Sequence, residues 1–207
     1  MEIDIYLFGA SGHCKVIIDI IASTQDLTIK GIVDDYPNQK ELCDIPVFNT
    51  NSFGTFSDKQ FIVSVGNNRT RKKIVDHLSA IYPIAVHSQA IVSKRAIIGK
   101  GTVIMACAVV NSDAFIGQHC IINTAAVIEH DCKIANYVHV SPNVTLAGNI
   151  IVGEGTHLGI GATVIQGIKI GKWATIGAGS VVIRDVPDYA VVVGNPGKII
   201  KYNVENE

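Results

Sequence analysis

The sequence lacks the features that mark a membrane protein, a secreted protein or a nucleic-acid-binding protein. Its 207 residues carry 17 Lys and Arg against 18 Asp and Glu, and the formal net charge of −1 creates no field that attracts nucleic acid or an anionic membrane surface. No apolar run approaches the roughly 20 residues that span a bilayer. The acidic start of the chain has no signal-peptide layout. We therefore expect a cytoplasmic protein that binds neither nucleic acid nor membrane.

What the sequence does contain is an unbroken six-residue repeat over residues 86–186. Its first position is always Val, Ile or Leu, beginning with Val86, Val92 and Ile98. Its fifth position is mostly small or β-branched, and its second position supplies glycines such as Gly99 and Gly117, which tolerate sharp corners. This period fits neither an amphipathic helix nor an ordinary strand. It predicts a parallel β-helix in which three hexads form one triangular coil, with the first and fifth positions inside.

The five cysteines are scattered and form no CxxC pair, so we do not expect a disulfide framework. Cys120 and Cys132 fall on inward positions of the repeat and are expected to be small buried hydrophobes. Cys14 and Cys107 are the candidates for greater exposure, although no neighbour of either suggests an activated thiolate.

The first 85 residues follow a different pattern, in which short apolar strands alternate with helical segments. We predict strands over residues 3–8, 29–33 and 61–65 and helices over residues 16–22 and 69–82. This alternation is typical of a small, Rossmann-like parallel α/β sheet. The sequence thus predicts an α/β unit over residues 1–85, followed by a β-helix with a C-terminal tail over residues 86–207.

Three polar or glycine-rich loops follow the predicted strands, at residues 9–13, 34–35 and 66–69. Ligands bind at the carboxyl ends of parallel strands, so we expect these loops to share one crevice. In the first loop, Gly9 and Gly12 lie between a strand and a helix, where backbone N–H groups can hold a phosphate. The GxxG spacing is a weak match to the GxGxxG of nicotinamide cofactors. It favours a nucleotide diphosphate, with a purely structural tight turn as the alternative.

The segment Glu129-His130-Asp131 differs from the ordinary solvated face of the repeat. His130 occupies a third hexad position, which faces outward, and a carboxylate flanks it on each side. A neighbouring carboxylate fixes the tautomer of a histidine and stabilises the imidazolium that forms when the ring accepts a proton. The pattern favours a general base; the alternative is a surface histidine among solvated acids.

The spacing of the histidines also bears on assembly. His139 and His157 are one coil of 18 residues apart and should stack on the same face, whereas His130 and His139 are half a coil apart and cannot share a face of one chain. If His130 and His139 serve one site, they come from neighbouring subunits, which suggests a cyclic homotrimer. For His119 and His157 a surface or packing role is favoured.

Together these segments resemble the bacterial sugar acyltransferases of the left-handed β-helix superfamily. The similarity is greatest to the group that contains sialic acid O-acetyltransferases and nucleotide-4-amino-sugar N-acetyltransferases, such as the enzyme of bacillosamine synthesis. It covers essentially the whole chain and rests on residues 9–13, 34–35, 66–69, 123–132, 139–141 and 191–198. The resemblance implies left-handed coils. It also implies transfer of an acetyl group from acetyl-CoA to the amine of a nucleotide-linked 4-amino-4,6-dideoxy-sugar, for surface glycan biosynthesis.

The resemblance assigns expected roles to individual residues. His130 matches the general base, Asp131 the acid that tunes it, and Glu129 a less direct contributor. The positions that match the loops holding the nucleotide sugar are Ser11, Gly12, His13, Asp34, Asp35, Gly66, Asn67 and Arg69. The positions that match the path of acetyl-CoA are His139, Ala147, Gly148, Gly161, Ala162, Gly177, Ala178 and Lys198. Two residues depart from the family pattern: Cys14 replaces a common glycine beside the expected pyrophosphate, and Gly197 replaces an alanine.

The groups present favour direct attack of the acceptor on the thioester, because no Ser or Cys lies in a recognisable nucleophile motif. A backbone N–H near Gly148 is a candidate to stabilise the oxyanion. No metal is expected, although a γ-carbonic anhydrase shares the β-helix and would need three zinc-binding histidines. Two further functions stay open: an O-acetyltransferase that acts on sialic acid or another sugar, and a β-helix scaffold that binds a sugar nucleotide without turnover.

Overall fold

The α/β unit comes first in the chain. The computed structural model describes residues 3–24 and 26–203. The elements of this unit are β1 (Ile3–Phe8), α1 (Gly12–Ala22), β2 (Leu27–Asp34), β3 (Glu41–Leu42), β4 (Ile45–Asn49), α2 (Thr50–Phe53), β5 (Gln60–Val63) and α3 (Asn68–His77). The sheet order is β3-β4-β2-β1-β5, with β1 parallel to both β2 and β5. From β1 the chain continues to β2 on one side, and β5 later pairs with the other side of β1. The carboxyl ends of β1 and β5 therefore form the switch point where ligands bind in such sheets.

All three predicted strands are present, whereas both predicted helices have different limits. α1 begins at Gly12, earlier than the predicted residue 16. α3 ends at His77 rather than at residue 82, because Leu78 has extended dihedral angles and Ile81 pairs with Gln60 at the edge of the sheet. The prediction missed β3, β4 and α2, whose segment shows neither a clear period of two nor a clear helical period.

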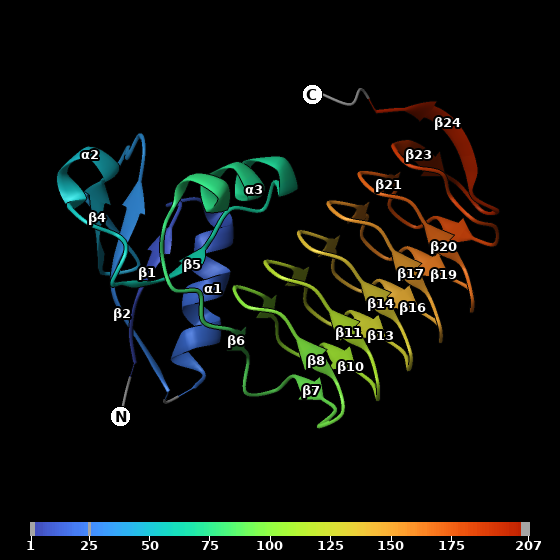
Figure 1. Ribbon diagram of the computed structural model, residues 1–207, viewed down its shortest axis with the longest axis horizontal. Coiled ribbons are helices and arrows are strands. Elements are labelled where there is room, and N and C mark those ends of the chain that lie inside the picture. The colour runs from blue at the N-terminus through green and yellow to red at the C-terminus, as the bar shows by residue number, and fades with distance from the viewer. Residues whose placement is uncertain (1–2, 25, 204–207) are drawn as a thin grey trace.

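The β-helix occupies the next hundred residues. Its strands are β6 (Ala85–Val86), β7 (Ile91–Val92), β8 (Ile97–Ile98), β9 (Val103–Ile104), β10 (Val109–Val110), β11 (Phe115–Ile116), β12 (Ile121–Ile122), β13 (Val127–Ile128), β14 (Lys133–Ile134), β15 (His139–Val140), β16 (Thr145–Leu146), β17 (Ile151–Val152), β18 (His157–Leu158), β19 (Thr163–Val164), β20 (Lys169–Ile170), β21 (Thr175–Ile176) and β22 (Val181–Val182). From β6 to β19, each strand pairs in parallel with the third strand after it, as β10 does with β13. The coils therefore have three flat sides, which we name by their first strands as the β6, β7 and β8 sides. Figure 1 shows them stacked away from the α/β unit.

The C-terminal segment closes the end of the β-helix. β23 (Ala190–Val193) pairs with β21 on the β6 side, and β24 (Lys198–Tyr202) runs antiparallel to β23. Among the residues that the structure describes, no helix is long and apolar enough to cross a membrane.

The aliphatic first positions of the hexads face the shaft, as the repeat predicts. From Ile104 to Val182 every one of them is buried, and Ile128 and Leu146 have no exposed surface. Cys120 and Cys132 also lie in the shaft. Only the first positions of the N-terminal coil, beginning with Val86, are partly buried. The hexad register predicted from the sequence is therefore confirmed.

Cys14 does not have the greater exposure suggested by its place beside a loop. It lies inside α1, faces the apolar cluster under the sheet and has no exposed surface. Burial raises the pKa of its thiol to about 11. Cys14 is thus an unreactive packing residue, while Cys107 is exposed at a corner of the coils.

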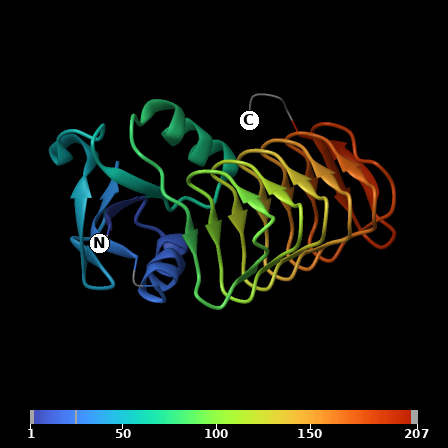
Figure 2. The ribbon, with the colours of Figure 1, turned by 60° about the horizontal axis from the view of Figure 1, so that its bottom comes forward.

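The α/β unit packs directly on the β6 side of the coils. A single apolar cluster joins Ile17 and Ile20 of α1 to Val103, Met105 and Ile121 of the coils. α1 and α3 cover opposite faces of the sheet, since Ile17 packs with Leu7 of β1 whereas Ile74 packs with Phe8, and Figure 2 shows both helices next to the first coils. This packing fixes the carboxyl edge of the sheet relative to the β6 side.

Candidate active site

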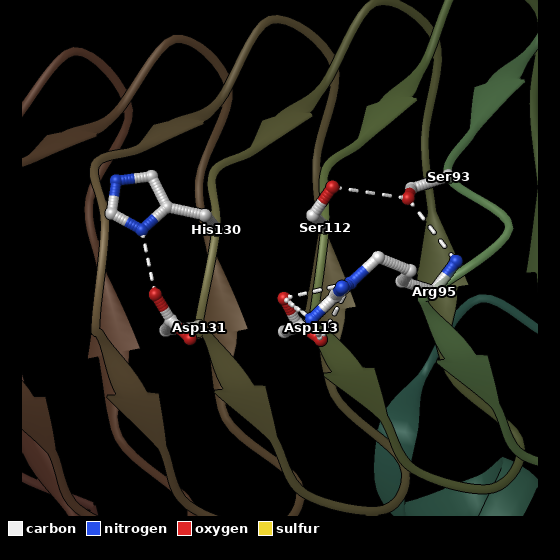
Figure 3. Close-up of polar contacts among 6 residues, drawn as sticks. All are labelled: Ser93, Arg95, Ser112, Asp113, His130 and Asp131. Carbon is white, nitrogen blue, oxygen red and sulfur yellow. Dashed lines mark hydrogen bonds and ion pairs between the residues drawn. The ribbon is translucent and has the colours of Figure 1, made fainter.

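His130 lies on the corner between β13 and β14, where the β7 and β8 sides meet (Figure 3). Its Nδ1–H donates a hydrogen bond to Oδ2 of Asp131 at 2.7 Å. The His130 side chain is 61% exposed, and within the described part of the chain its Nε2 has no hydrogen-bond partner. A proton held on Nδ1 leaves the Nε2 lone pair directed away from Asp131, which is the tautomer that a general base requires.

The charges around His130 favour its protonated form. The pKa of His130 is raised above its ordinary value, chiefly by the hydrogen bond to Asp131 and further by the charges of Asp131 and Glu129. Glu129 is half-buried, and its backbone N–H donates to the carbonyl of Leu146 at 3.0 Å. Glu129 therefore acts on the ring through charge alone, whereas Asp131 also orients it.

Gly148 occupies the same corner as His130, one coil further along the chain. A Cβ atom on Gly148 would lie 2.6 Å from Cε1 and 2.7 Å from Nε2 of His130. The imidazole thus rests against bare backbone, and only glycine leaves it this position. The corner backbone is also tied to His130, since the N–H of Asn149 donates to the His130 carbonyl at 2.9 Å.

A row of charged side chains runs along this corner away from Gly148 (Figure 3). Arg95 contacts both carboxylate oxygens of Asp113 through Nε and Nη2, at distances between 2.8 and 3.2 Å. Asp113 and Asp131 are one coil apart, in equivalent positions. Arg95 therefore neutralises Asp113, which is the carboxylate in this row that lies next to Asp131.

The loops at the carboxyl edge of the sheet form a second group of candidate residues. The backbone N–H of Ala10 donates to Oδ2 of Asp34 at 2.8 Å, and that of Tyr36 donates to Oδ1 at 2.9 Å. Asp34 therefore holds the glycine turn against the end of β2. Ser64 reinforces the same turn, because its hydroxyl donates to the Gly9 carbonyl at 2.7 Å.

Two helices begin at this edge of the sheet. α1 starts after Ser11, whose side chain makes no capping hydrogen bond, and α3 starts after Asn67, whose side chain accepts from the N–H of Thr70 at 2.9 Å. Gly12 and Gly66 have open space where a Cβ would project. Helix N-termini with exposed backbone N–H groups suit the phosphates of a nucleotide diphosphate.

Three histidines meet where the sheet edge faces the coils. The rings of His139 and His157 stack at 5.0 Å between centroids, and the ring of His13 lies 6.4 Å from that of His139. The predicted stacking of His139 on His157 is confirmed. Nδ2 of Asn123 donates to Nε2 of His139 at 3.0 Å, and Ser141 repeats this contact with His157 one coil later, at 2.9 Å.

Burial keeps these histidines neutral. It lowers the pKa of His139 to about 3, with further contributions from His157 and Arg71. Burial and the charge of Arg71 lower the pKa of His13 to about 4. Nε2 of His13 is buried and has no partner among the described residues. The rings stack rather than point at a common centre, and the described residues contain no group of three or more His, Cys, Asp or Glu that could hold a metal ion.

α3 is locked to the coils by residues that sequence reasoning missed. Arg71 is 1% exposed, and its guanidinium donates to the carbonyls of Val65 and Gly66 on one side and of His119 and Tyr137 on the other. These four oxygens lie in three segments that are distant in sequence: the loop after β5 and two successive coils. Arg71 thus fixes the loop after β5 to the β-helix.

The corner between the β8 and β6 sides has the shape that lets α3 pack against the coils. At 18-residue intervals, the left-handed position of this corner holds either glycine or an aromatic residue: Gly101, His119, Tyr137, Gly155 and Trp173. A Cβ on Gly101 would collide with the His119 ring, and one on Gly155 with the Trp173 ring. Arg69 lies over Trp173 at 4.6 Å and Lys72 over Tyr137 at 4.9 Å. This 18-residue series of glycine and aromatic residues is the sequence signal that could have identified this docking face.

A cavity of about 680 Å³ opens between the start of α3 and the coils. Its lining includes Gly66, Asn67, Asn68, Arg69, Thr70, Lys73, His139, Gly155, His157, Trp173, Ala174, Thr175 and Asn203. Three predicted nucleotide-sugar residues, Gly66, Asn67 and Arg69, therefore meet the predicted acetyl-CoA residue His139 in one cavity. This cavity lies on the β6 side, which is opposite the His130 corner in each triangular coil.

The residues predicted to contact acetyl-CoA lie on two different corners. Gly161, Gly177 and Ala178 are on the corner between the β6 and β7 sides, whereas Ala147 and Gly148 share the corner of His130. No single corner of one chain carries them all. Lys198 begins β24, beside Arg184 in a small cavity at the C-terminal end of the coils.

Ala162 is the one buried residue of the set predicted to contact acetyl-CoA. It has no exposed surface, because it occupies an inward fifth position and its methyl group faces the shaft. Its backbone N–H donates to the Gly159 carbonyl, and its own carbonyl accepts from Thr145. The methyl group of Ala162 therefore packs in the shaft, and its place on the acetyl-CoA path stays a prediction.

Comparison with known proteins agrees with this architecture. Residues 4–78 match the family described as the PglD N-terminal domain, and residues 113–148 match the bacterial transferase hexapeptide family of six repeats. A curated relative, UDP-N-acetylbacillosamine N-acetyltransferase of Bacillus subtilis (strain 168), is 43% identical over 111 residues. The match covers 50% of this chain and 51% of the relative, so it spans about half the length of that protein.

Two solved structures match nearly the whole chain. One is a perosamine N-acetyltransferase from Caulobacter crescentus, with a histidine replaced by asparagine, in complex with CoA and GDP-perosamine. It is 35% identical with a TM-score of 0.88, over 96% of this chain and 97% of that chain. The other is the acetyltransferase domain of PglB from Neisseria gonorrhoeae FA1090. It is 36% identical with a TM-score of 0.89, over 95% of this chain and 99% of that chain.

The fold and these matches define the chain as a hexapeptide-repeat acyltransferase with a left-handed β-helix. Within that class it belongs to the family of nucleotide-amino-sugar N-acetyltransferases that carry a PglD-type N-terminal domain.

Proposed function

We propose that this chain transfers the acetyl group of acetyl-CoA to the amino group of a nucleotide-linked 4-amino-4,6-dideoxy-sugar, as a step of surface glycan biosynthesis in the cytoplasm. The observation that carries the proposal is the His130-Asp131 pair, whose free Nε2 stands exposed over the bare backbone of Gly148. The Caulobacter relative, crystallised with CoA and GDP-perosamine, supports the donor and the acceptor class.

The chemistry follows from this geometry. The lone pair of the sugar amine attacks the thioester carbonyl carbon, a C–N bond forms and the C–S bond breaks. His130 takes the proton that the attacking nitrogen loses, on Nε2, and passes it to the departing thiolate of CoA. Asp131 stabilises the imidazolium in between. No residue of the protein has to form a covalent acyl intermediate, because the thioester is already activated.

We infer that the site is completed by two chains of a homotrimer. In one chain His130 and the cavity around His139 lie on opposite sides of each coil. A neighbouring β-helix packed alongside would bring its own His130 corner to this cavity. The residues proposed to bind acetyl-CoA then fall into one groove, with Gly148 from one chain and Gly161 and Gly177 from the next.

Exposed apolar side chains support this assembly. The faces that flank the His130 corner carry Ile91, Ile97, Phe115 and Ile151, which are 66%, 63%, 45% and 39% exposed. Cyclic packing of three chains around these faces would bury this surface.

The test is a panel of nucleotide-linked amino sugars with acetyl-CoA, in which released CoA thiol is measured. We expect turnover with at least one 4-amino sugar and none with the same sugar N-acetylated at that position. Turnover of free sialic acid, with no turnover of any nucleotide-linked amine, would instead establish an O-acetyltransferase. Binding of the nucleotide sugar with no thiol release from any acceptor would identify a non-catalytic scaffold.

A further inference from the structure

Asp113 and Asp131 occupy equivalent places on successive coils of the His130 corner. They are 18 residues apart, and both have a left-handed backbone with φ of 61°. The N–H of Asp131 donates to the Ser112 carbonyl at 3.2 Å, so the two turns are hydrogen-bonded to each other. Their backbones are therefore separated by about 4.8 Å, the spacing of neighbouring strands. Two carboxylates this close repel each other and attract the same cation.

Arg95 is the cation that reaches this pair of carboxylates. It belongs to the coil before Asp113, and its guanidinium lies on Asp113 with four contacts of 2.8 to 3.2 Å (Figure 3). Its backbone N–H donates to the Ser93 hydroxyl at 3.2 Å, and this hydroxyl contacts that of Ser112 at 3.3 Å. The side chain of Arg95 thus extends along the row in the direction of His130 and ends at Asp113.

The charge of Arg95 is also coupled to Asp131. The pKa of Arg95 is raised chiefly by its hydrogen bonds to Asp113 and by the charge of Asp113, and the charge of Asp131 adds to the rise. Oδ2 of Asp131 accepts from His130 at 2.7 Å, whereas Oδ1 has no partner in the described part of the chain. A guanidinium that was not held by Asp113 would be attracted to this open oxygen.

From this arrangement we propose that Arg95 and Asp113 form a positioning pair for the catalytic base, in which each residue keeps the charge of the other away from Asp131 and His130. Asp113 holds the guanidinium back, so that Asp131 accepts from His130 alone. Arg95 neutralises Asp113, so that His130 does not have a further bare carboxylate beside it. The proposal rests on the proposed function, because it takes His130 to be the base.

Other charged or titratable groups also surround the His130 corner. They are Glu129 and Asp131 in its own turn, Lys133 on β14, Lys94 on the coil of Arg95 and, in the proposed trimer, Arg69, Lys73, His139 and His157 of the neighbouring cavity. The turn that follows one coil later, at residues 147–149, has no charged side chain. Within the described part of the chain, Asp113 has Arg95 as its only ionic partner. The balance of charge beside Asp131 therefore depends on this one pair.

The test follows the titration of the His130 ring by NMR in the full-length protein at low salt, with its signal assigned by its loss in His130→Asn. Arg95→Met leaves Asp113 bare and should raise the pKa of His130. Asp113→Asn releases the guanidinium towards Asp131 and should lower it. We expect each shift to be about half a pH unit, the effect of one charge at about 8 Å near a protein surface. The double variant should titrate like the wild type, and about 1 M salt should reduce both shifts.

Activity supplies the second readout. Because the base works when neutral, the acidic limb of kcat/KM should move to higher pH in Arg95→Met and to lower pH in Asp113→Asn. Lys30→Met breaks another exposed ion pair, with Asp4 in the α/β unit, and should change neither readout.

Three results would overturn the proposal: shifts of the same sign in the two single variants, no shift in either, or an acidic limb that stays in place while the ring titration moves. If the ring titrates as expected but no amino sugar is acetylated by the wild type, the proposed function fails while the charge pairing stands.

Discussion

The imidazole of His130 lies against the backbone of Gly148, so closely that a Cβ on Gly148 would come within 2.6 Å of Cε1 in the ring. This relationship joins two successive coils and sets where the free Nε2 points. The repeat brings it about, because the two residues are 18 positions apart and share a corner. The contact leads to the first prediction.

Replacing Gly148 with Ala should displace the His130 ring without unfolding the coils, since the ring is exposed and can rotate away. We expect kcat to fall by about 10²-fold, the cost of roughly 1 Å of misplacement at a reacting centre. Steady-state kinetics check this, with circular dichroism to confirm the fold. Ser112→Ala, at the equivalent position two coils before Gly148, is the matched control and should keep wild-type kcat. Equal kcat in Gly148→Ala and wild type would show that the ring position does not matter.

Removing the base itself should have a larger effect. His130→Asn should lower kcat by about 10²–10⁴, the range for loss of a general base, with little change in the Michaelis constant for acetyl-CoA. The asparagine keeps a polar side chain on an exposed corner, so the fold should be unaffected. A kcat near the wild-type value at neutral pH would remove His130 from the mechanism.

The pH dependence should reveal the role of Asp131. The base works when neutral, so activity rises with pH through the pKa of His130, which the hydrogen bond to Asp131 raises. In Asp131→Asn that pKa should fall, and the acidic limb of kcat/KM should move to lower pH. The plateau should also drop, by less than in His130→Asn, because the ring is then less basic and less well oriented. An acidic limb that stays in place would mean that another group controls it.

Acid stability offers a test away from the site. His119 is 1% exposed, and burial lowers the pKa of its ring to about 4, with further contributions from Arg71 and Lys100. The folded protein therefore keeps His119 neutral, while the unfolded chain takes up a proton below about pH 6.5. Its contribution to stability is complete above that pH and is lost as the pH falls towards 4.

His119→Phe should remove this loss. Relative to wild type, the free energy of unfolding of the variant should gain about 3 kcal/mol between pH 7 and pH 4. The aromatic residues Tyr137 and Trp173 already occupy the same left-handed position in other coils, so phenylalanine is compatible with this backbone. Urea unfolding at both pH values measures the difference. Parallel loss of stability in the two proteins would contradict the assigned pKa.

Local patterns determined which parts of this structure could be predicted. The hexad fixes which side chains enter the shaft, so the burial of Ile128 and Leu146 followed from period alone. The same register places the methyl group of Ala162 inside the shaft. His130 and Asp131 are adjacent in sequence, so their pairing was also accessible.

The parts that were missed depend on long-range contacts. Arg71 donates hydrogen bonds to His119 and Tyr137, which are 48 and 66 residues away in sequence, and no local pattern in α3 predicts those partners. The end of α3 depends on Ile81 joining a sheet edge, which helical spacing alone cannot show.

The central claim is that each active site combines the loops of one chain with His130 of its neighbour. Two inactive variants test it when mixed. His130→Ala removes the base. Gly12→Asp adds a negative charge at the start of α1, where open space accepts the side chain but the charge repels a diphosphate. Neither variant alone should be active.

The most direct measurement is the specific activity of trimers assembled from equal amounts of the two variants, unfolded and refolded together. In a cyclic trimer with shared sites, about one site in four receives an intact loop from one chain and an intact His130 from the next. Our account predicts recovery of about a quarter of wild-type activity. Mixed trimers that stay as inactive as the separate variants would contradict it.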